Sequence, residues 1–320
     1  MHNNGKGALV ALTSFGLFSV HDLLVKLLGS TYSPVQILFF TVLFSFPFFS
    51  LTLIRHKRSG SLRPNRPLWT GIRTVTVVIT GFSSFTAFAL LPLTQTYALL
   101  FAMPLLITLL SIPMLGEKVG LHRGLAVVVG LLGVLIVLRP TAEPLSLGHL
   151  AGLVAAFGAA LSSVIVRRIG QHERPAVLLL YPLLANILVM GVLLPFVYEP
   201  MPVVHLGMFA AIAALSLTAT ALAIRAYRLG EAAVVAPMQY SQIILATIFG
   251  WAVFSEKPDA TTLLGASVVI ASGAYVVLRE TRAGGNQPVL KTRTRFETGA
   301  APRVRSLMEA GSDETAEEAI

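Results

Sequence analysis

The stretch 74-TVTVVITGFSSFTAFALLPLTQTYALLFAMPLLITLLSIPMLG-116 decides the fold class, because it contains no Asp, Glu, Lys, Arg or His. A helix that crosses about 30 Å of hydrocarbon needs about 20 mostly apolar residues, so this stretch is long enough to cross a bilayer twice. Its central segment Leu91-Pro92-Leu93-Thr94 is typical of a tight turn. We therefore predict two membrane-spanning helices here, joined at this turn.

The composition of the whole chain extends this conclusion to the rest of the sequence. Of 320 residues, 55% are hydrophobic and 12% are charged, whereas soluble domains carry about 25% charged residues. The apolar runs are continuous, which favours spanning helices over the alternating segments of a spanning β-barrel. The chain has no cysteine, which excludes a disulfide framework, a Cys-ligated metal site and a Cys nucleophile.

The apolar runs predict an all-α integral membrane protein with ten spanning helices, at residues 7–28, 34–54, 71–90, 95–115, 120–138, 148–167, 176–196, 206–226, 232–253 and 261–278. They divide the chain into a cytoplasmic N-terminus at 1–6, a five-helix unit at 7–138, an outer linker at 139–147, a second five-helix unit at 148–279 and a tail at 280–320. The tail has mixed charges and little apolar sequence, so we predict that it is disordered and cytoplasmic.

The positive charges predict the orientation in the membrane. With the N-terminus inside, the cytoplasmic connections carry fourteen Lys and Arg residues, and the opposite side carries three, Lys26, Arg139 and Lys257. Positively charged short loops stay cytoplasmic. We therefore predict a multi-pass protein of the cell (inner) membrane with both termini in the cytoplasm. The net charge of +9 is then a signal of topology, and no nucleic-acid partner is expected.

The second half of the apolar region repeats the first at a shift of 139 to 142 residues. Corresponding pairs follow the same order along both halves: Phe15-Gly16 and Phe157-Gly158, Pro34 and Pro175, Phe101 and Tyr240, Glu117-Lys118 and Glu256-Lys257. A unit with an odd number of spans enters the membrane in the opposite sense when it is repeated. The sequence therefore predicts two inverted repeats, a construction typical of secondary transporters that bind substrate between the repeats.

The elements Gly116-Glu117-Lys118 and Ser255-Glu256-Lys257 follow the fourth helix of each half, and a Gly-rich fifth helix ends in Leu-Arg. This pattern resembles the EamA type of the drug/metabolite transporter superfamily, over residues 7 to about 280. The resemblance implies transport of a small organic metabolite through a central cavity, without ATP hydrolysis. The segment Ser19-Val20-His21-Asp22-Leu23-Leu24-Val25-Lys26 resembles the branch with riboflavin and S-adenosylmethionine uptake carriers.

Charges inside spans are costly, so Asp22 and Lys26 of the first span are the leading candidates for a functional site. Four residues apart, they lie on one helical face. Either Asp22 is a substrate or proton site that Lys26 tunes, or the two form a self-neutralising pair whose Lys snorkels to the outer surface. The neighbouring His21 is expected to be a polar group of a cavity or interface, with a proton relay as the alternative.

The polar and aromatic residues of the uncharged spans are candidates for lining a cavity. Phe101 and Tyr240 occupy corresponding positions in the two halves, where they could clamp a flat ligand by stacking, and the alternative is ordinary core packing. With the first-span residues, the candidate substrate-binding set is Asp22, Lys26, His21, Tyr97, Phe101, Gln239, Tyr240, Gln242 and Ser163.

Other residues are predicted to be structural. Glu117 and Glu256 are expected to cap the helix that follows each of them. Five prolines within spans should kink or break their helices locally; they are Pro47, Pro104, Pro113, Pro182 and Pro237. Pro104 and Pro237 are near the cavity candidates, where they could act as gating bends. A stripe of small residues in the sixth span should pack helices closely, within the bundle or in a dimer; its members are Gly148, Gly152, Ala156 and Ala160.

The sequence thus predicts a secondary transporter of a small organic metabolite that works by alternating access, with riboflavin or a similar flat metabolite as the best substrate. The alternatives are an amino-acid or metabolite exporter of the same family and, in another class, a membrane scaffold or receptor that does not transport. Protease, zinc-hydrolase and nucleotide-binding motifs are missing from the sequence, so no enzyme is expected. We expect no cofactor and no metal; the expected partners are a small-molecule substrate and the lipid bilayer, and a homodimer stays open.

Overall fold

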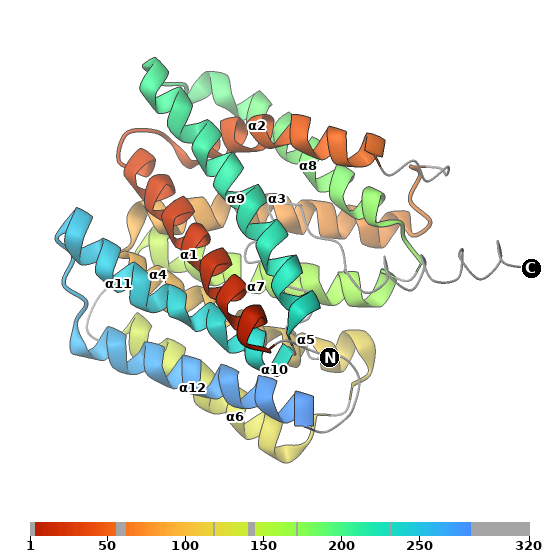
Figure 1. Ribbon diagram of the computed structural model, residues 1–320, viewed down its shortest axis with the longest axis vertical. Helices are drawn as coiled ribbons and strands as arrows, with labels where there is room; N and C mark the ends of the chain where they lie inside the picture. Colours follow the sequence, from red (N-terminus) through yellow and green to blue (C-terminus); the bar gives the residue numbers. More distant parts are fainter. Residues whose placement is uncertain are drawn as a thin grey trace, which may run out of the picture.

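A computed structural model describes residues 4–55, 62–117, 119–139, 145–170, 172–230 and 232–282, and its regular structure in these ranges is helical throughout (Figure 1). The first half contains α1 (Asn4–Gly29), α2 (Pro34–Arg55), α3 (Pro67–Leu90), α4 (Leu93–Leu100), α5 (Met103–Leu115) and α6 (Leu121–Leu138). The second half contains α7 (Leu147–Ile169), α8 (Pro175–Leu193), the 3₁₀ turn η1 (Leu194–Phe196), α9 (Val203–Leu229), α10 (Ala232–Val235), the 3₁₀ segment η2 (Ala236–Tyr240), α11 (Ser241–Phe254) and α12 (Ala260–Arg282).

Seven of the described helical stretches are long and apolar enough to cross a membrane. They are Asn4–Gly29, Pro67–Leu90, Leu93–Leu115, Leu121–Leu138, Leu147–Ile169, Ala176–Phe196 and Val203–Leu229. Two further apolar helical stretches, Pro34–Pro47 and Ala260–Val276, are shorter. The all-helical fold class is therefore confirmed, and the chain is a multi-pass membrane protein. The predicted tail beyond residue 282 lies outside the described residues.

Two stretches of helix are interrupted at corresponding places in the two halves. The first stretch divides between Leu100 and Met103, directly before Pro104 in the first turn of α5. The other passes from α10 through η2, which contains Pro237, into α11. Proline removes a backbone donor and clashes with the preceding turn, and 3₁₀ geometry inside a longer helix commonly marks a functional hinge. The breaks predicted at these two prolines are confirmed, whereas Pro47, Pro113 and Pro182 lie inside continuous helices and break none of them.

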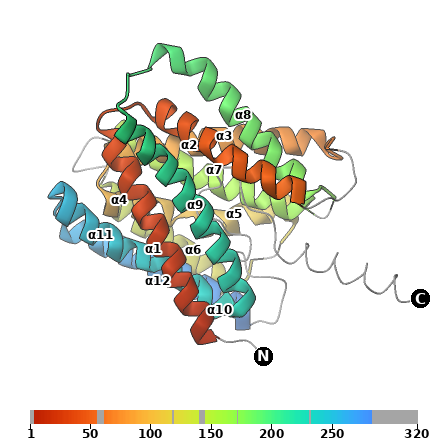
Figure 2. The same ribbon diagram turned by 45° about the horizontal axis from the view of Figure 1, so that its top comes forward.

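The most extensive helix contacts join one half of the chain to the other. The pairs are α1 with α9, α3 with α7, and α6 with α12, and Figures 1 and 2 show α1 lying beside α9. Small residues allow these close approaches: a Cβ on Gly7 would lie 2.8 Å from Gly230 Cα. The hydroxyl of Ser14 donates to the carbonyl of Ala219 over 2.6 Å. The two halves are therefore interleaved rather than packed side by side.

The small-residue stripe of α7 belongs to the bundle. A Cβ on Gly148 would lie 2.8 Å from Leu91 Cγ at the end of α3, and one on Gly152 would lie 2.9 Å from Leu99 Cδ1 of α4. Ala156 and Ala160 are fully buried. Of the two alternatives for this stripe, packing within the bundle is the one found.

We expect Gly265→Ala to destabilise the contact between α6 and α12. The new Cβ would lie 2.7 Å from the carbonyl oxygen of Gly133 and 2.6 Å from Val137 Cγ2, and forcing an atom into a packed contact costs about 1–3 kcal/mol. The measurement is the melting temperature of the purified protein in detergent. Gly124→Ala, on the same α6, is the control because a Cβ there meets nothing within 4 Å. Equal melting temperatures for the two variants would contradict this packing.

Candidate functional site

Asp22 of α1 is the carboxylate at the centre of the candidate site. It is 1% exposed, and its Oδ1 lies 2.8 Å from His21 Nδ1. The hydroxyl of Tyr97, from the short helix α4, donates to Oδ2. A buried carboxylate inside a span is costly and is retained where it has partners and a function. Three of the predicted site residues are therefore brought together, at the helix that precedes the first interruption.

Lys26 has a different ionic partner from the one predicted. Its Nζ lies 2.6 Å from Glu256 Oε1 and donates to the carbonyl of Leu91, and the Phe254 ring centroid is 5.1 Å away. The side chain is buried. Snorkelling to the outer surface is not found, because the side chain is buried, and its described ionic partner is a carboxylate from the other half of the chain rather than Asp22.

Glu256 also corrects the capping prediction. Its Oε2 accepts the backbone N–H of Leu93 over 3.0 Å. Leu93 is the first residue of α4, where the free N–H groups and the helix dipole favour a negative charge. Glu256 therefore caps a helix of the first half, and the prediction that it caps the following helix α12 is wrong.

Glu117 of the first half forms the corresponding contact with the second half. Its Oε1 pairs with Arg167 of α7 and its Oε2 lies 3.9 Å from Arg123 of α6. Arg167 also donates to Ser111 Oγ over 3.4 Å. Among the described residues, no side chain caps the start of α6, so the capping prediction for Glu117 is wrong too. The two ion pairs are therefore equivalent under the repeat. Each joins a basic residue near the end of the first helix of one half to the Glu that follows the fourth apolar stretch of the other half.

The two ion pairs lie at opposite ends of the α3 and α7 layer. Lys26 binds Leu91 at the end of α3, whereas the guanidinium of Arg168, next to Arg167, lies 4.5 Å from the ring centroid of Trp69 near the start of α3. At about 1.5 Å per residue, the helix between Trp69 and Leu91 spans about 33 Å. That length is close to the thickness of a bilayer core.

A continuous row of aromatic rings connects the two interrupted stretches. The ring centroids of Phe88 and Tyr97 are 5.6 Å apart, those of Tyr97 and Phe101 are 5.8 Å apart, and those of Phe101 and Tyr240 are 5.2 Å apart. Phe101 and Tyr240 meet edge to face at 86°. The two predicted clamp residues therefore touch each other in this conformation, and a flat ligand would enter between them only after the rings separate.

Several buried polar atoms near these elements have no hydrogen-bond partner within the described ranges. They include His21 Nε2, Ser84 Oγ, Ser163 Oγ, Tyr240 Oη and Gln242 Oε1. Gln242 is fully buried and its Nε2 donates to the carbonyl of Phe15 over 3.4 Å, so it lies against α1. Gln239 is half-buried in η2. Among the described contacts, no hydrogen bond or ring contact joins Gln239 or Ser163 to Asp22.

Sequence reasoning missed Glu256 as a member of this site. The repeat contained a usable signal, because Glu256 corresponds to Glu117, and Lys26 corresponds to Arg167 at a shift of 141 residues. Two charge pairs related by a repeat are more informative than two isolated charges. The pairing across the halves was nevertheless hidden, since it depends on the interleaving of the helices.

Buried charges held between two interleaved halves, next to two interrupted helices, define a membrane protein built as secondary transporters are. The family follows from the sequence match: residues 5–139 and 146–279 each match the EamA-like transporter family, and the chain belongs to it. This family is part of the drug/metabolite transporter superfamily, as the sequence motifs predicted.

Relatives with assigned names differ in substrate and in direction of transport. A riboflavin transporter of Vibrio cholerae is 33% identical over 194 residues, which make up 60% of this chain and 64% of that protein. The match therefore spans less than two thirds of the length of that relative. An S-adenosylmethionine uptake transporter of Rickettsia bellii is 23% identical over 83% of this chain and 91% of its own length. The pseudopaline exporter CntI of Pseudomonas aeruginosa is 26% identical over 87% of this chain and 97% of its own length.

Proposed function

We propose that this protein is a secondary transporter that moves a small organic metabolite across the cytoplasmic membrane by alternating access. In this proposal ten spanning helices form two inverted repeats, and both termini lie in the cytoplasm. The symmetry of the helix contacts supports the repeat. In the second half, α7 corresponds to α1 and α9 corresponds to α3. The contact of α1 with α9 is therefore matched by the contact of α7 with α3. The excess of Lys and Arg in alternate loops supports the orientation.

The observation that carries the proposal is the arrangement of three polar contacts along the bundle. Asp22 and Tyr97 are buried beside the first helix interruption, and an ion pair lies toward each end, Lys26 with Glu256 and Arg167 with Glu117. Alternating access needs closure at one end while the other end is open. Two ion pairs related by the repeat supply an equivalent closure for each end.

For the substrate we propose riboflavin or a similar flat metabolite taken up by the cell. The riboflavin transporter among the relatives and the row of rings that ends in Phe101 and Tyr240 support it. A flat heterocycle would stack on such rings, and the buried polar atoms of His21 and Gln242 would bind its edge. Export of a metabolite is the second candidate, favoured by the similarity to the pseudopaline exporter.

Expression of this protein is expected to let a riboflavin auxotroph grow at limiting riboflavin. The physical reason is that a specific pathway raises the entry rate of a polar heterocycle that crosses lipid slowly. Growth is compared with that of cells carrying the empty vector, after the protein has been detected in the membrane fraction. Correctly inserted protein without rescue would contradict riboflavin uptake. Efflux of riboflavin from preloaded cells would instead support the export alternative.

A further inference from the structure

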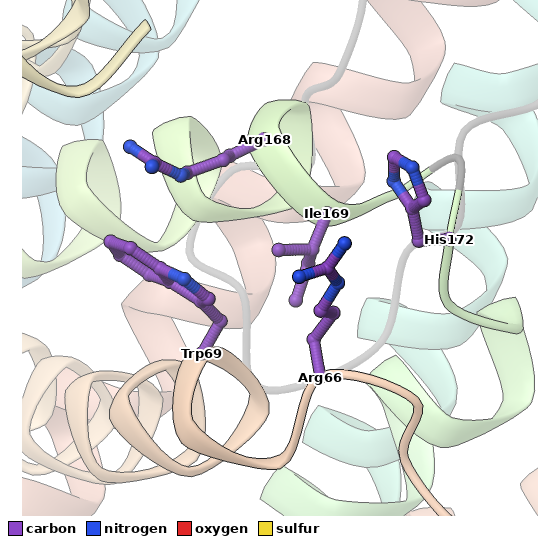
Figure 3. Close-up of a pocket in the computed structure, with 5 residues that line it drawn as sticks. All are labelled: Arg66, Trp69, Arg168, Ile169 and His172. Atoms are coloured by element: carbon purple, nitrogen blue, oxygen red, sulfur yellow. The ribbon is translucent and has the colours of Figure 1, made fainter.

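A basic pocket lies at the end of the bundle that carries Arg167, away from the Asp22 site. It has a volume of about 200 Å³ and is lined by Arg66, Trp69, Arg168, Ile169 and His172. Figure 3 shows Arg66 and Trp69 rising from the start of α3 toward Arg168 and Ile169 of α7, with His172 on the turn that follows α7. Three of the five lining residues are basic.

The basic residues of this pocket differ in how they are held. Arg168 is fixed, because its guanidinium lies over the Trp69 ring and its Nη1 donates to the carbonyl of Met114. The side chains of Arg66 and His172 are exposed and have no hydrogen bond or ion pair within the described part of the chain. The pocket therefore presents one positioned guanidinium and two basic groups that can turn toward a ligand.

One oxygen of the nearby Glu173 carboxylate, Oε1, is engaged with the backbone, and Oε2 has no hydrogen-bond partner among the described residues. Glu173 is buried, and its Oε1 accepts the N–H of Arg66 and lies 3.5 Å from Thr70 Oγ1. In this role it stabilises the entry into α3 and leaves the side chain of Arg66 facing the pocket (Figure 3). The side chains that line the pocket thus carry positive charge without an acidic member.

An apolar stripe runs along α3 from the level of this pocket. Its members are spaced by four, three and four residues, so they share one helical face; they are Leu68, Ile72, Val75 and Ile79, which are 72%, 38%, 59% and 47% exposed. Such a face is suited to acyl chains. A tryptophan at the start of the helix is typical of the boundary between headgroups and hydrocarbon.

We propose that this pocket binds the phosphate of an anionic phospholipid, with its acyl chains along the exposed face of α3. Guanidinium groups bind phosphate oxygens with two parallel hydrogen bonds, and basic pockets between spanning helices bind anionic headgroups at the cytoplasmic side. The apolar stripe favours a lipid over a free phosphate-bearing metabolite, which shares the headgroup chemistry. The proposal depends on the membrane placement of α3 and is independent of the transported substrate.

The test measures lipid binding by native mass spectrometry of the full chain in detergent, with added phosphatidylglycerol, phosphatidylcholine or sn-glycerol 3-phosphate. Wild-type protein is expected to retain phosphatidylglycerol in preference to phosphatidylcholine. Arg66→Gln is expected to weaken this binding about fivefold, since one arginine near an anionic headgroup contributes about 1 kcal/mol. Arg66→Gln with Arg168→Gln should weaken it further.

Arg228→Gln is the matched control, because Arg228 is an exposed arginine at the end of α9 that does not line the pocket. Equal retention of phosphatidylglycerol by Arg66→Gln and Arg228→Gln would overturn the proposal. Displacement of the lipid by equimolar sn-glycerol 3-phosphate would also overturn it, in favour of a soluble ligand. If the double variant does not fold, Arg66→Gln alone decides, because the side chain of Arg66 makes no described contact. Transport is not measured, so a failure of the proposed function would leave this test intact.

Discussion

Proteoliposomes that contain the Asp22→Asn variant are expected to lose accumulation of radiolabelled riboflavin under an imposed pH gradient, while exchange at equal concentrations persists. Asp22 is 1% exposed and is bound by His21 and Tyr97, so it is the carboxylate best placed to carry a proton with the substrate. Asparagine keeps the shape of the side chain but cannot be ionised, and its amide nitrogen replaces one acceptor oxygen with a donor. The measurement compares initial uptake rates with and without the gradient.

The control for this prediction is Ser19→Ala. Ser19 is buried on the same α1, and its hydroxyl donates to the carbonyl of Phe15 within its own helix, so coupled uptake should stay near that of the wild type. An Asp22→Asn variant that still concentrates riboflavin under the gradient would refute proton coupling through Asp22.

The Tyr97→Phe variant removes one hydrogen bond to the Asp22 carboxylate, a loss of about 1.5–3 kcal/mol. We expect the initial rate of coupled uptake to fall about tenfold to hundredfold.

The second large effect is expected from the two ion pairs, and the absence of cysteine from the chain makes it measurable. A single cysteine introduced as Thr94→Cys would directly follow Leu93, whose backbone N–H donates to Glu256, and Thr94 is 4% exposed. Glu256→Gln should raise the labelling of this cysteine by an impermeant maleimide from outside. We expect the labelling rate to rise about tenfold. Breaking a buried ion pair costs several kcal/mol, and the partial exposure of Glu256 makes this cost smaller.

The opposite pair supplies the control. Glu117→Gln weakens the contact with Arg167 and should favour opening at the end that we propose to be cytoplasmic, which lowers the labelling of Thr94→Cys from outside. Lys26→Gln combined with Glu256→Gln should label no faster than either single variant, because the partners act as one unit. General unfolding would raise labelling in every variant. An equal rise in the Glu117→Gln and Glu256→Gln variants would therefore contradict the proposed closures.

Much of the fold could be predicted from the sequence because membrane helices are strongly constrained. The uncharged stretch around Leu91 predicted two helices with a turn, and the structure ends α3 at Leu90 and begins α4 at Leu93. Two of the five prolines within spans, Pro104 and Pro237, predicted where helical stretches are interrupted, and the other three lie inside continuous helices. These features are local, since they depend on apolar length and on the missing donor of proline.

The partners of the charged residues could not be predicted in the same way. Spacing along α1 placed Asp22 and Lys26 on one face, yet Lys26 binds Glu256 and Asp22 binds Tyr97. These choices depend on which helices meet, and the interleaving of the two halves is not visible in local patterns. The substrate-binding roles of all nine candidate residues, Gln239 and Ser163 included, stay predictions.

The contact between α1 and α9 has a consequence for biogenesis. Ser14 and its acceptor Ala219 are separated by 205 residues, so at synthesis rates of about 5–20 residues per second, α1 leaves the ribosome about 10–40 s before its partner. During this interval the glycine and serine face of α1 meets lipid or an insertion factor instead of α9. We expect the early intermediate to be the stage most exposed to quality-control proteases, and truncation before α9 to leave α1 without its main packing partner.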